Sequence, residues 1–128
     1  MGLVKIAGYI GRSRQEVTEV EFLVDTGGFY TAISHQLREP LALPAGIWEQ
    51  TQLADRSIVD VEVTLAHLRL NGREAAVQIE VMDVPVPLLG VNALETLGMK
   101  VNPVSGELEV VWPFDAPPSI STFLPPSP

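Results

Sequence analysis

Asp25 is the residue whose setting is best suited to chemistry. It follows the apolar run 22–24, and Thr26-Gly27-Gly28 comes directly after it, before an apolar, β-branched run resumes. A carboxylate at the end of an apolar strand is costly unless it is hydrogen-bonded or shares its charge. Two glycines allow the chain to turn with positive φ, or to approach another backbone closely. The pattern therefore predicts a reactive carboxylate on a tight turn, and an ordinary Asp–Gly turn is the alternative.

Strands must position this turn, because the dominant spacing of apolar residues along the chain is two. The pair Asn71-Gly72 is typical of a tight hairpin, and the polar run 54–57 forms the tip of a longer one. Strands are expected over residues 3–10, 17–24, 30–33, 47–53, 58–65, 67–70, 74–82 and 107–112.

One segment has the signals of a helix. Asn92 is a capping residue with Glu95 three positions on, and Gly98 follows as a stop signal. Ser34 caps at most a brief helical turn, which Pro40 closes. The fold class is therefore all-β with one short helix, in a domain over residues 1–112. The proline-rich residues 113–128 are expected to form an extended or disordered tail.

A second stretch repeats the outline of the Asp25 turn. The run 87–92 leads proline and two leucines into Gly90 and a brief turn, as the run 22–27 leads apolar residues into Asp25-Thr26-Gly27. We expect two similar strands whose glycine ends lie near one another.

The composition excludes several classes of function. A net charge of −8 argues against a nucleic acid or an anionic membrane as partner, and no apolar run reaches the length of a membrane span. The chain has no cysteine and two histidines, so we expect no thiol-based or histidine-rich metal site and no cofactor. The absence of cysteine also fits a cytoplasmic protein.

The run 22–27 resembles the aspartic proteases of the retroviral type, the retropepsins and their cellular relatives. About sixty residues later that family has apolar residues, a glycine and a short helix, and here the run 87–94 occupies that place. The run 97–108 is similar to the segment after the helix in bacterial and archaeal members. The resemblance covers residues 3–112 and implies a closed-barrel acid protease that works as a homodimer.

This chemistry needs two carboxylates that share one proton. Asp55, Asp60, Asp83 and Asp115 lack both the apolar approach strand and the following Thr/Ser-Gly. The resemblance therefore implies that Asp25 of two copies meets on a two-fold axis. Thr26 is expected to lock the two loops together, and Gly27 is expected to donate its amide to the carboxylate. Together these three residues form the predicted catalytic site.

The resemblance also implies which residues contact an extended peptide or an unfolded protein substrate. The hairpin with Ala54, Asp55 and Arg56 at its tip is expected to be a flap that closes over the substrate. Arg56 is equally well explained as a solvated tip residue. The loop residues Gly28 and Phe29, with Leu88, complete the predicted binding surface.

Two departures from the family pattern support a second hypothesis. Alanine or serine commonly follows Asp-Thr-Gly in the family, where this chain has Gly28, and retroviral flap tips are glycine-rich, where the run 54–57 has no glycine. The alternative function is therefore a dimerising or peptide-binding module with the same fold and weak or absent catalysis.

Overall fold

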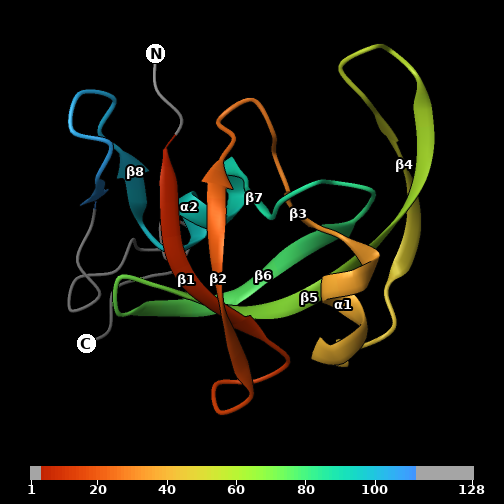
Figure 1. The fold of residues 1–128 in the computed structure, drawn as a ribbon, viewed down its shortest axis with the longest axis horizontal. Coiled ribbons are helices and arrows are strands. Elements are labelled where there is room, and N and C mark those ends of the chain that lie inside the picture. Colours follow the sequence, from red (N-terminus) through yellow and green to blue (C-terminus); the bar gives the residue numbers. More distant parts are fainter. Residues whose placement is uncertain (1–3, 112–128) are drawn as a thin grey trace, which may run out of the picture.

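The computed structural model describes residues 4–111, which form nine strands and two short helices (Figure 1). The predicted tail 113–128 lies outside the described residues. The elements are β1 Lys5–Gly11, β2 Val17–Val24, β3 Thr31–Ile33, α1 His35–Leu41, β4 Ile47–Gln52, β5 Ile58–Leu70, β6 Arg73–Val81, β7 Leu88–Leu89, α2 Val91–Thr96, β8 Met99–Val101 and β9 Leu108–Val110. Half of the described residues are in strands, as the period-two pattern predicts.

Seven of the strands form one strongly curled sheet in the order β1-β2-β7-β3-β6-β5-β4, and β8 pairs with β9 separately. The sheet curls so far that β1 also pairs with β5, where Tyr9 lies opposite Arg69. The prediction of a closed barrel is nevertheless wrong. β4 is an edge strand that pairs with β5 alone, and its hairpin extends from the body of the sheet (Figure 1). The two-residue β7 holds β2 and β3 together over a very short ladder.

The hairpins follow the turn residues closely, with one difference. Asn71 and Gly72 have φ of 52° and 80°, as a tight hairpin turn requires. The strands predicted at 58–65 and 67–70 are a single strand, β5, of 13 residues. Its first half pairs with β4, and residues 62–70 pair with β6. The strand therefore continues past Ala66 without a break, because Ala66 pairs with Val77 of β6.

The structure has two helices where the sequence predicted one. Ser34 caps α1 by accepting a hydrogen bond from the Leu37 amide, and this helix runs to Leu41 with Pro40 in its last turn. The helix predicted from Asn92 is α2, but it begins at Val91 with Gly90 as its N-cap. Neither helix of the described residues is long and apolar enough to cross a membrane.

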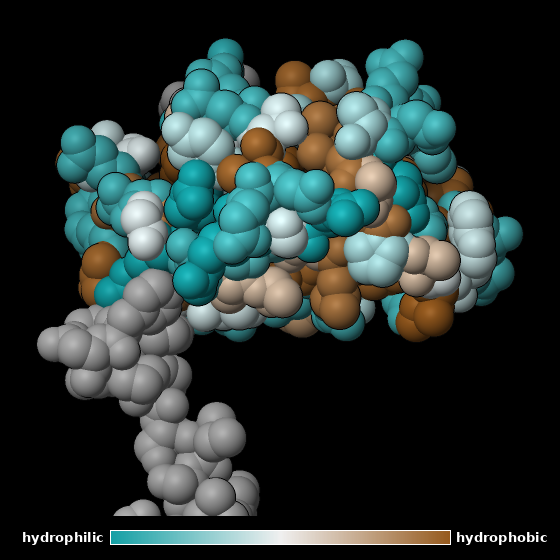
Figure 2. Space-filling view, turned by 90° about the horizontal axis from the view of Figure 1, so that it is seen from below, coloured by the Kyte–Doolittle hydropathy of each residue, from teal (hydrophilic) through white to brown (hydrophobic). Residues whose placement is uncertain are grey.

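The core lies inside the curl of the sheet. Its largest fully buried side chains come from β1, β2, β3, β5, β6, β7 and the end of α2, and they include Phe22, Ile10, Ile33, Leu68, Leu70, Ile79, Leu89 and Leu97. Apolar side chains on the face shown in Figure 2 lie in small groups among hydrophilic ones. Phe22, Ile33 and Leu89 lie at or near the ends of β2, β3 and β7, so the buried core holds the strands on both sides of the Asp25 loop.

An ion pair attaches α1 to the sheet. The Arg38 guanidinium donates to both oxygens of Glu62, with Nε–Oε1 2.8 Å and Nη2–Oε2 3.1 Å, and also to the carbonyls of Leu43 and Pro44. Both side chains are mostly buried, with exposures of 20% and 16%. The amide of Gly46 donates to the same carboxylate.

Replacing Arg38 by methionine is expected to lower the free energy of unfolding by about 2–4 kcal/mol, because it leaves a largely buried carboxylate without its cation. The measurement is urea unfolding at neutral pH. Arg12→Met is the matched control, since Arg12 pairs with Glu16 at the surface and such pairs contribute about 0–1 kcal/mol. Equal losses in the two variants would contradict this assignment.

The same pair predicts a pH dependence. The hydrogen bonds from Arg38 and then from the Gly46 amide hold the pKa of Glu62 below its ordinary value. A carboxyl group whose pKa is lower in the folded state contributes stability above its unfolded pKa and loses it as the pH falls through the folded pKa. The difference in stability between the wild type and Arg38→Met should therefore be full at neutral pH and shrink in acid.

Candidate active site

The loop that begins at Asp25 is fixed at its start by β7. β2 and β7 run parallel, with Leu23 beside Leu88 and Val24 beside Leu89. The Asp25 amide then donates to the Leu89 carbonyl at 2.9 Å. On its other side β7 pairs with β3, where Leu88 lies opposite Ala32. The strand carrying the second glycine motif therefore lies directly beside the strand that delivers Asp25, as the sequence predicts.

The turn itself holds the Asp25 carboxylate in place. The Gly27 amide donates to Oδ1 at 3.1 Å, as predicted, and the Gly28 amide donates to the Asp25 carbonyl at 3.1 Å. Asp25 is half-buried, whereas Thr26 and Gly27 are exposed. A Cβ at position 28 would lie 3.0 Å from Asp25 Oδ2, a tight contact. Gly28 therefore leaves open space beside the carboxylate.

Gly90 joins the second motif to the same loop. Its amide donates to the hydroxyl of Thr31, a fully buried residue, at 3.0 Å. The next two amides, those of Val91 and Asn92, donate to the carbonyls of Gly28 and Phe29. Loop carbonyls thus take the place of a side-chain cap at the start of α2. Sequence reasoning did not single out Thr31, whose signal is a hydroxyl at the first position of an otherwise apolar strand.

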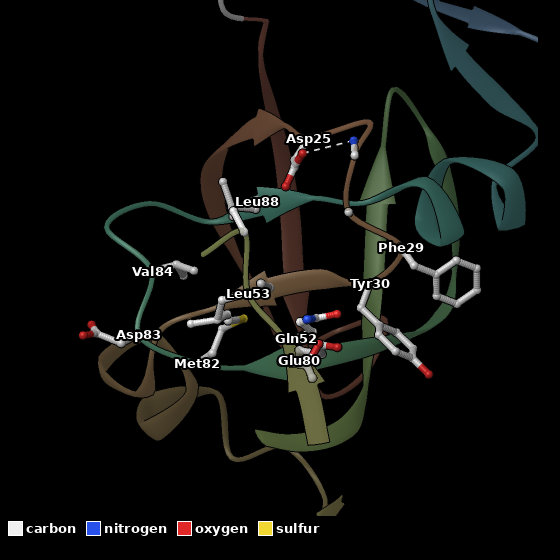
Figure 3. Close-up of a pocket in the computed structure, with 15 residues that line it drawn as sticks. Asp25, Phe29, Tyr30, Gln52, Leu53, Glu80, Met82, Asp83, Val84 and Leu88 are labelled. Atoms are coloured by element: carbon white, nitrogen blue, oxygen red, sulfur yellow. Dashed lines mark hydrogen bonds between the residues drawn. The ribbon is translucent and has the colours of Figure 1, made fainter. Parts of the chain in front are cut away.

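A cavity of about 730 Å³ opens beside Asp25 (Figure 3). Its walls are the Asp25 loop, the end of β4 with the residues after it, the end of β6 with the residues after it, and β7. The predicted site residues that line it are Asp25, Gly27, Gly28, Phe29, Ala54 and Leu88. The Phe29 side chain itself is 58% exposed and packs edge-on against Tyr30, with ring centroids 5.0 Å apart.

Thr26, Asp55 and Arg56 do not line this cavity. The Asp55 carboxylate accepts hydrogen bonds from the hydroxyl and the amide of Ser57, and these bonds lower its pKa. Arg56 has a φ of 71°, in the left-handed region that favours glycine. The tip of the β4–β5 hairpin is therefore an internally bonded turn, and contact of Asp55 and Arg56 with a substrate stays a prediction.

Replacing Arg56 by glycine is expected to raise the free energy of unfolding by about 0.5–1 kcal/mol, because an L side chain at positive φ is strained. Thermal or urea unfolding gives the value. Ala54→Gly is the control in the same turn, since Ala54 has an ordinary φ and should lose stability on substitution. Arg56→Gly destabilising the protein as much as Ala54→Gly would show that the turn is not strained.

Several cavity residues were missed by sequence reasoning, and Glu80 is the most unusual of them. It is 9% exposed, and burial followed by the charge of Glu49 raises its pKa. The alternation of Val77, Ile79 and Val81 with polar residues predicts that Glu80 faces solvent. The curl of the sheet instead turns that face of β6 toward the cavity.

The arrangement offers acid–base chemistry on a water molecule or a bound carbonyl group, since a half-buried carboxylate stands at the edge of a cavity. Among residues 4–111, no three His, Asp or Glu side chains are grouped so that they could hold a metal ion.

The model of a protein family described as aspartyl protease matches residues 4–101, which include the whole Asp25 loop, the β4–β5 hairpin and the Gly90 motif. No curated protein matches the chain.

Proposed function

Because the chain belongs to an aspartyl protease family of the retropepsin-like clan, we propose that it is an aspartic endopeptidase whose working form is a homodimer. In this dimer the Asp25 carboxylates of two copies meet at the two-fold axis and activate one water molecule. The observation that supports the proposal is a site with one of the two acids that the reaction needs. Asp25 lies at the edge of the cavity, beside the exposed Thr26 and Gly27.

A second carboxylate is not supplied from within the described chain. Besides Asp25, the acidic residues that line the cavity are Glu80 and Asp83. Glu80 lies at the opposite end of the cavity from Asp25, and the Asp83 side chain points away from it (Figure 3). The second acid therefore comes from a second copy, whose loop would cover Thr26 and Gly27.

The reaction follows from two acids that share one proton. The ionised carboxylate takes a proton from water, whose oxygen attacks the peptide carbonyl carbon, while the protonated carboxyl donates its proton to the carbonyl oxygen. The tetrahedral intermediate collapses as a proton passes to the nitrogen and the C–N bond breaks. The products are a new carboxyl end and a new amine end. The Gly27 amide holds Asp25 in position through these steps.

The cavity suits an extended peptide. Leu53, Met82, Val84 and Leu88 give it apolar walls that fit hydrophobic side chains beside the scissile bond. The β4–β5 hairpin, whose residues up to Ala54 form one wall, would close over the bound chain and exclude water.

The test measures the fraction of dimer and the cleavage activity in the same samples. Cleavage of a denatured protein, measured across protein concentration beside sedimentation of the same samples, should give a specific activity that rises with the fraction of dimer. A statine-type transition-state mimic should inhibit it. Specific activity that stays constant while the dimer dissociates would overturn the shared site.

A non-cleaving, peptide-binding dimer remains the alternative. Gly28 beside Asp25 and the glycine-free hairpin tip 54–57 favour it, because both differ from the family pattern. Binding of peptides with equal affinity by the wild type and by Asp25→Asn, with no cleavage by either, would support this alternative.

A further inference from the structure

Glu80 is a charged side chain in an interior strand at the far end of the cavity from Asp25 (Figure 3). Its strand neighbours are Ala32 in β3 and Val63 in β5. More than nine-tenths of its surface is covered, and what remains faces the cavity. Burying a carboxylate in such a place lowers stability unless a cation or several hydrogen bonds compensate.

The surroundings of Glu80 supply little compensation. Hydrogen bonding with the Thr51 side chain on β4 lowers its pKa and is the smallest of the three causes that act on it. Glu80 takes part in none of the ion pairs formed within residues 4–111. The charged group that affects the pKa of Glu80 is Glu49, which is also acidic. The charge of Glu80 in turn raises the pKa of the Tyr30 hydroxyl. Burial and the Glu49 charge both raise the pKa of Glu80.

The rest of the cavity fits the stem of a basic side chain. Lysine and arginine bury their methylene groups along apolar surfaces while their charged ends seek an acceptor. Leu53, Met82 and Leu88 provide such a surface between Asp25 and Glu80. A carboxylate has about four acceptor sites, so the bond from Thr51 leaves room for a cation.

We propose that Glu80 determines specificity by binding a lysine or arginine side chain of the substrate, at a position that flanks the scissile bond. The inference rests on the proposed function and deepens it by naming a feature of the substrate. In a two-fold dimer each copy brings its own Glu80, so a basic residue is accepted on either side of the cleaved bond. Glu80 has no cationic partner within residues 4–111, and the basic side chain of the bound peptide would be that partner.

Matched peptides test this preference. Each carries an apolar pair at its centre and has lysine, methionine or glutamate at one flanking position at a time. Wild-type protein should favour lysine over methionine by about tenfold to a hundredfold in kcat/KM at the responsive position, since hydrogen bonds between charged groups are worth that much. Glutamate there should be the poorest substrate. A wild-type enzyme with no lysine preference at any flanking position overturns the inference.

Variants assign the preference to one residue. Glu80→Gln keeps the shape of the side chain and one acceptor oxygen, and it should reduce the lysine-to-methionine ratio of kcat/KM to about twofold or less. Asp83→Asn is the matched control, because it neutralises the other carboxylate of this wall and should keep the ratio. A preference that survives in Glu80→Gln, or that disappears equally in Asp83→Asn, contradicts the assignment.

Binding separates this inference from the proposed function. The same peptides, carrying a fluorophore, are titrated with wild type, Asp25→Asn and Glu80→Gln. Lysine-selective binding that depends on Glu80, without cleavage by any variant, supports the basic subsite and removes the protease proposal. Cleavage with equal use of lysine and methionine supports the protease proposal and removes the subsite.

Discussion

Asp25→Asn is expected to lower kcat for peptide cleavage by about a thousandfold or more, with KM little changed. Asparagine is nearly isosteric with aspartate and keeps an oxygen that can accept the Gly27 amide, so the loop should stay in place. It can neither take a proton from water nor share one across a dimer axis. In a homodimer the substitution removes both acids at once. The measurement is steady-state cleavage of a single peptide by purified protein.

The control for this substitution is Asp60→Asn. Asp60 is an exposed residue of β5 and does not line the cavity, so the same change of charge there should leave kcat within about twofold. Sedimentation should give the same fraction of dimer for the wild type and both variants. Residual activity of Asp25→Asn near the wild-type level would exclude Asp25 as the catalytic acid.

Gly90→Ala is expected to lower the free energy of unfolding by about 3 kcal/mol and to abolish activity. A Cβ at this position would lie 2.3 Å from the Tyr30 carbonyl oxygen and 2.7 Å from that of Phe29. Both contacts are with backbone atoms, which cannot rotate away as a side chain can. The loop from Asp25 to Tyr30 would have to move away from α2, breaking the bonds that join them. Urea unfolding and peptide cleavage report the two effects.

Gly72→Ala separates this steric effect from the ordinary conformational role of glycine. Gly72 has a φ of 80°, but a Cβ there would meet no atom within 4 Å. Its replacement should cost about 1–2 kcal/mol through backbone strain and leave activity intact, because the β5–β6 turn lies at the opposite end of β6 from the cavity residue Glu80. If Gly90→Ala costs no more than Gly72→Ala and stays active, the close approach at Gly90 is not what holds the loop.

Local signals in the sequence predicted the parts of the fold that depend on local chemistry. The Asn71-Gly72 turn and the strand before Asp25 follow from turn residues and apolar spacing, and the similar outlines of the two glycine motifs indicated that their ends lie near one another. The start of α2 does not, because its first amides are bonded by Thr31 and by carbonyls of the Asp25 loop rather than by Asn92. Because Thr31 is 59 residues from Gly90, the residues around the helix start give no sign of this cap.

The site was predicted in the same uneven way. Asp25, Gly27 and Leu88 were expected from the motifs and line the cavity, whereas Glu80 was not recognised. In a flat sheet the polar positions of β6 would face solvent, and alternation alone cannot reveal that a curled sheet encloses them. The closed barrel was an expectation from the family resemblance, and the free edge of β4 is the point at which it fails.

From the place of the two-residue β7 in the sheet we infer an order of folding. β7 is held between β2 and β3, and each of these belongs to a different part of the sheet. The β1–β2 and β5–β6 hairpins join neighbouring segments and can form early, whereas β7 has a place only after both of its flanking strands are set. Asp25 is anchored by β7, so its loop is completed by one of the last strands to dock. If the chain is the protease proposed above, it has no active site while it is folding, when its own unfolded copies would be its nearest substrates.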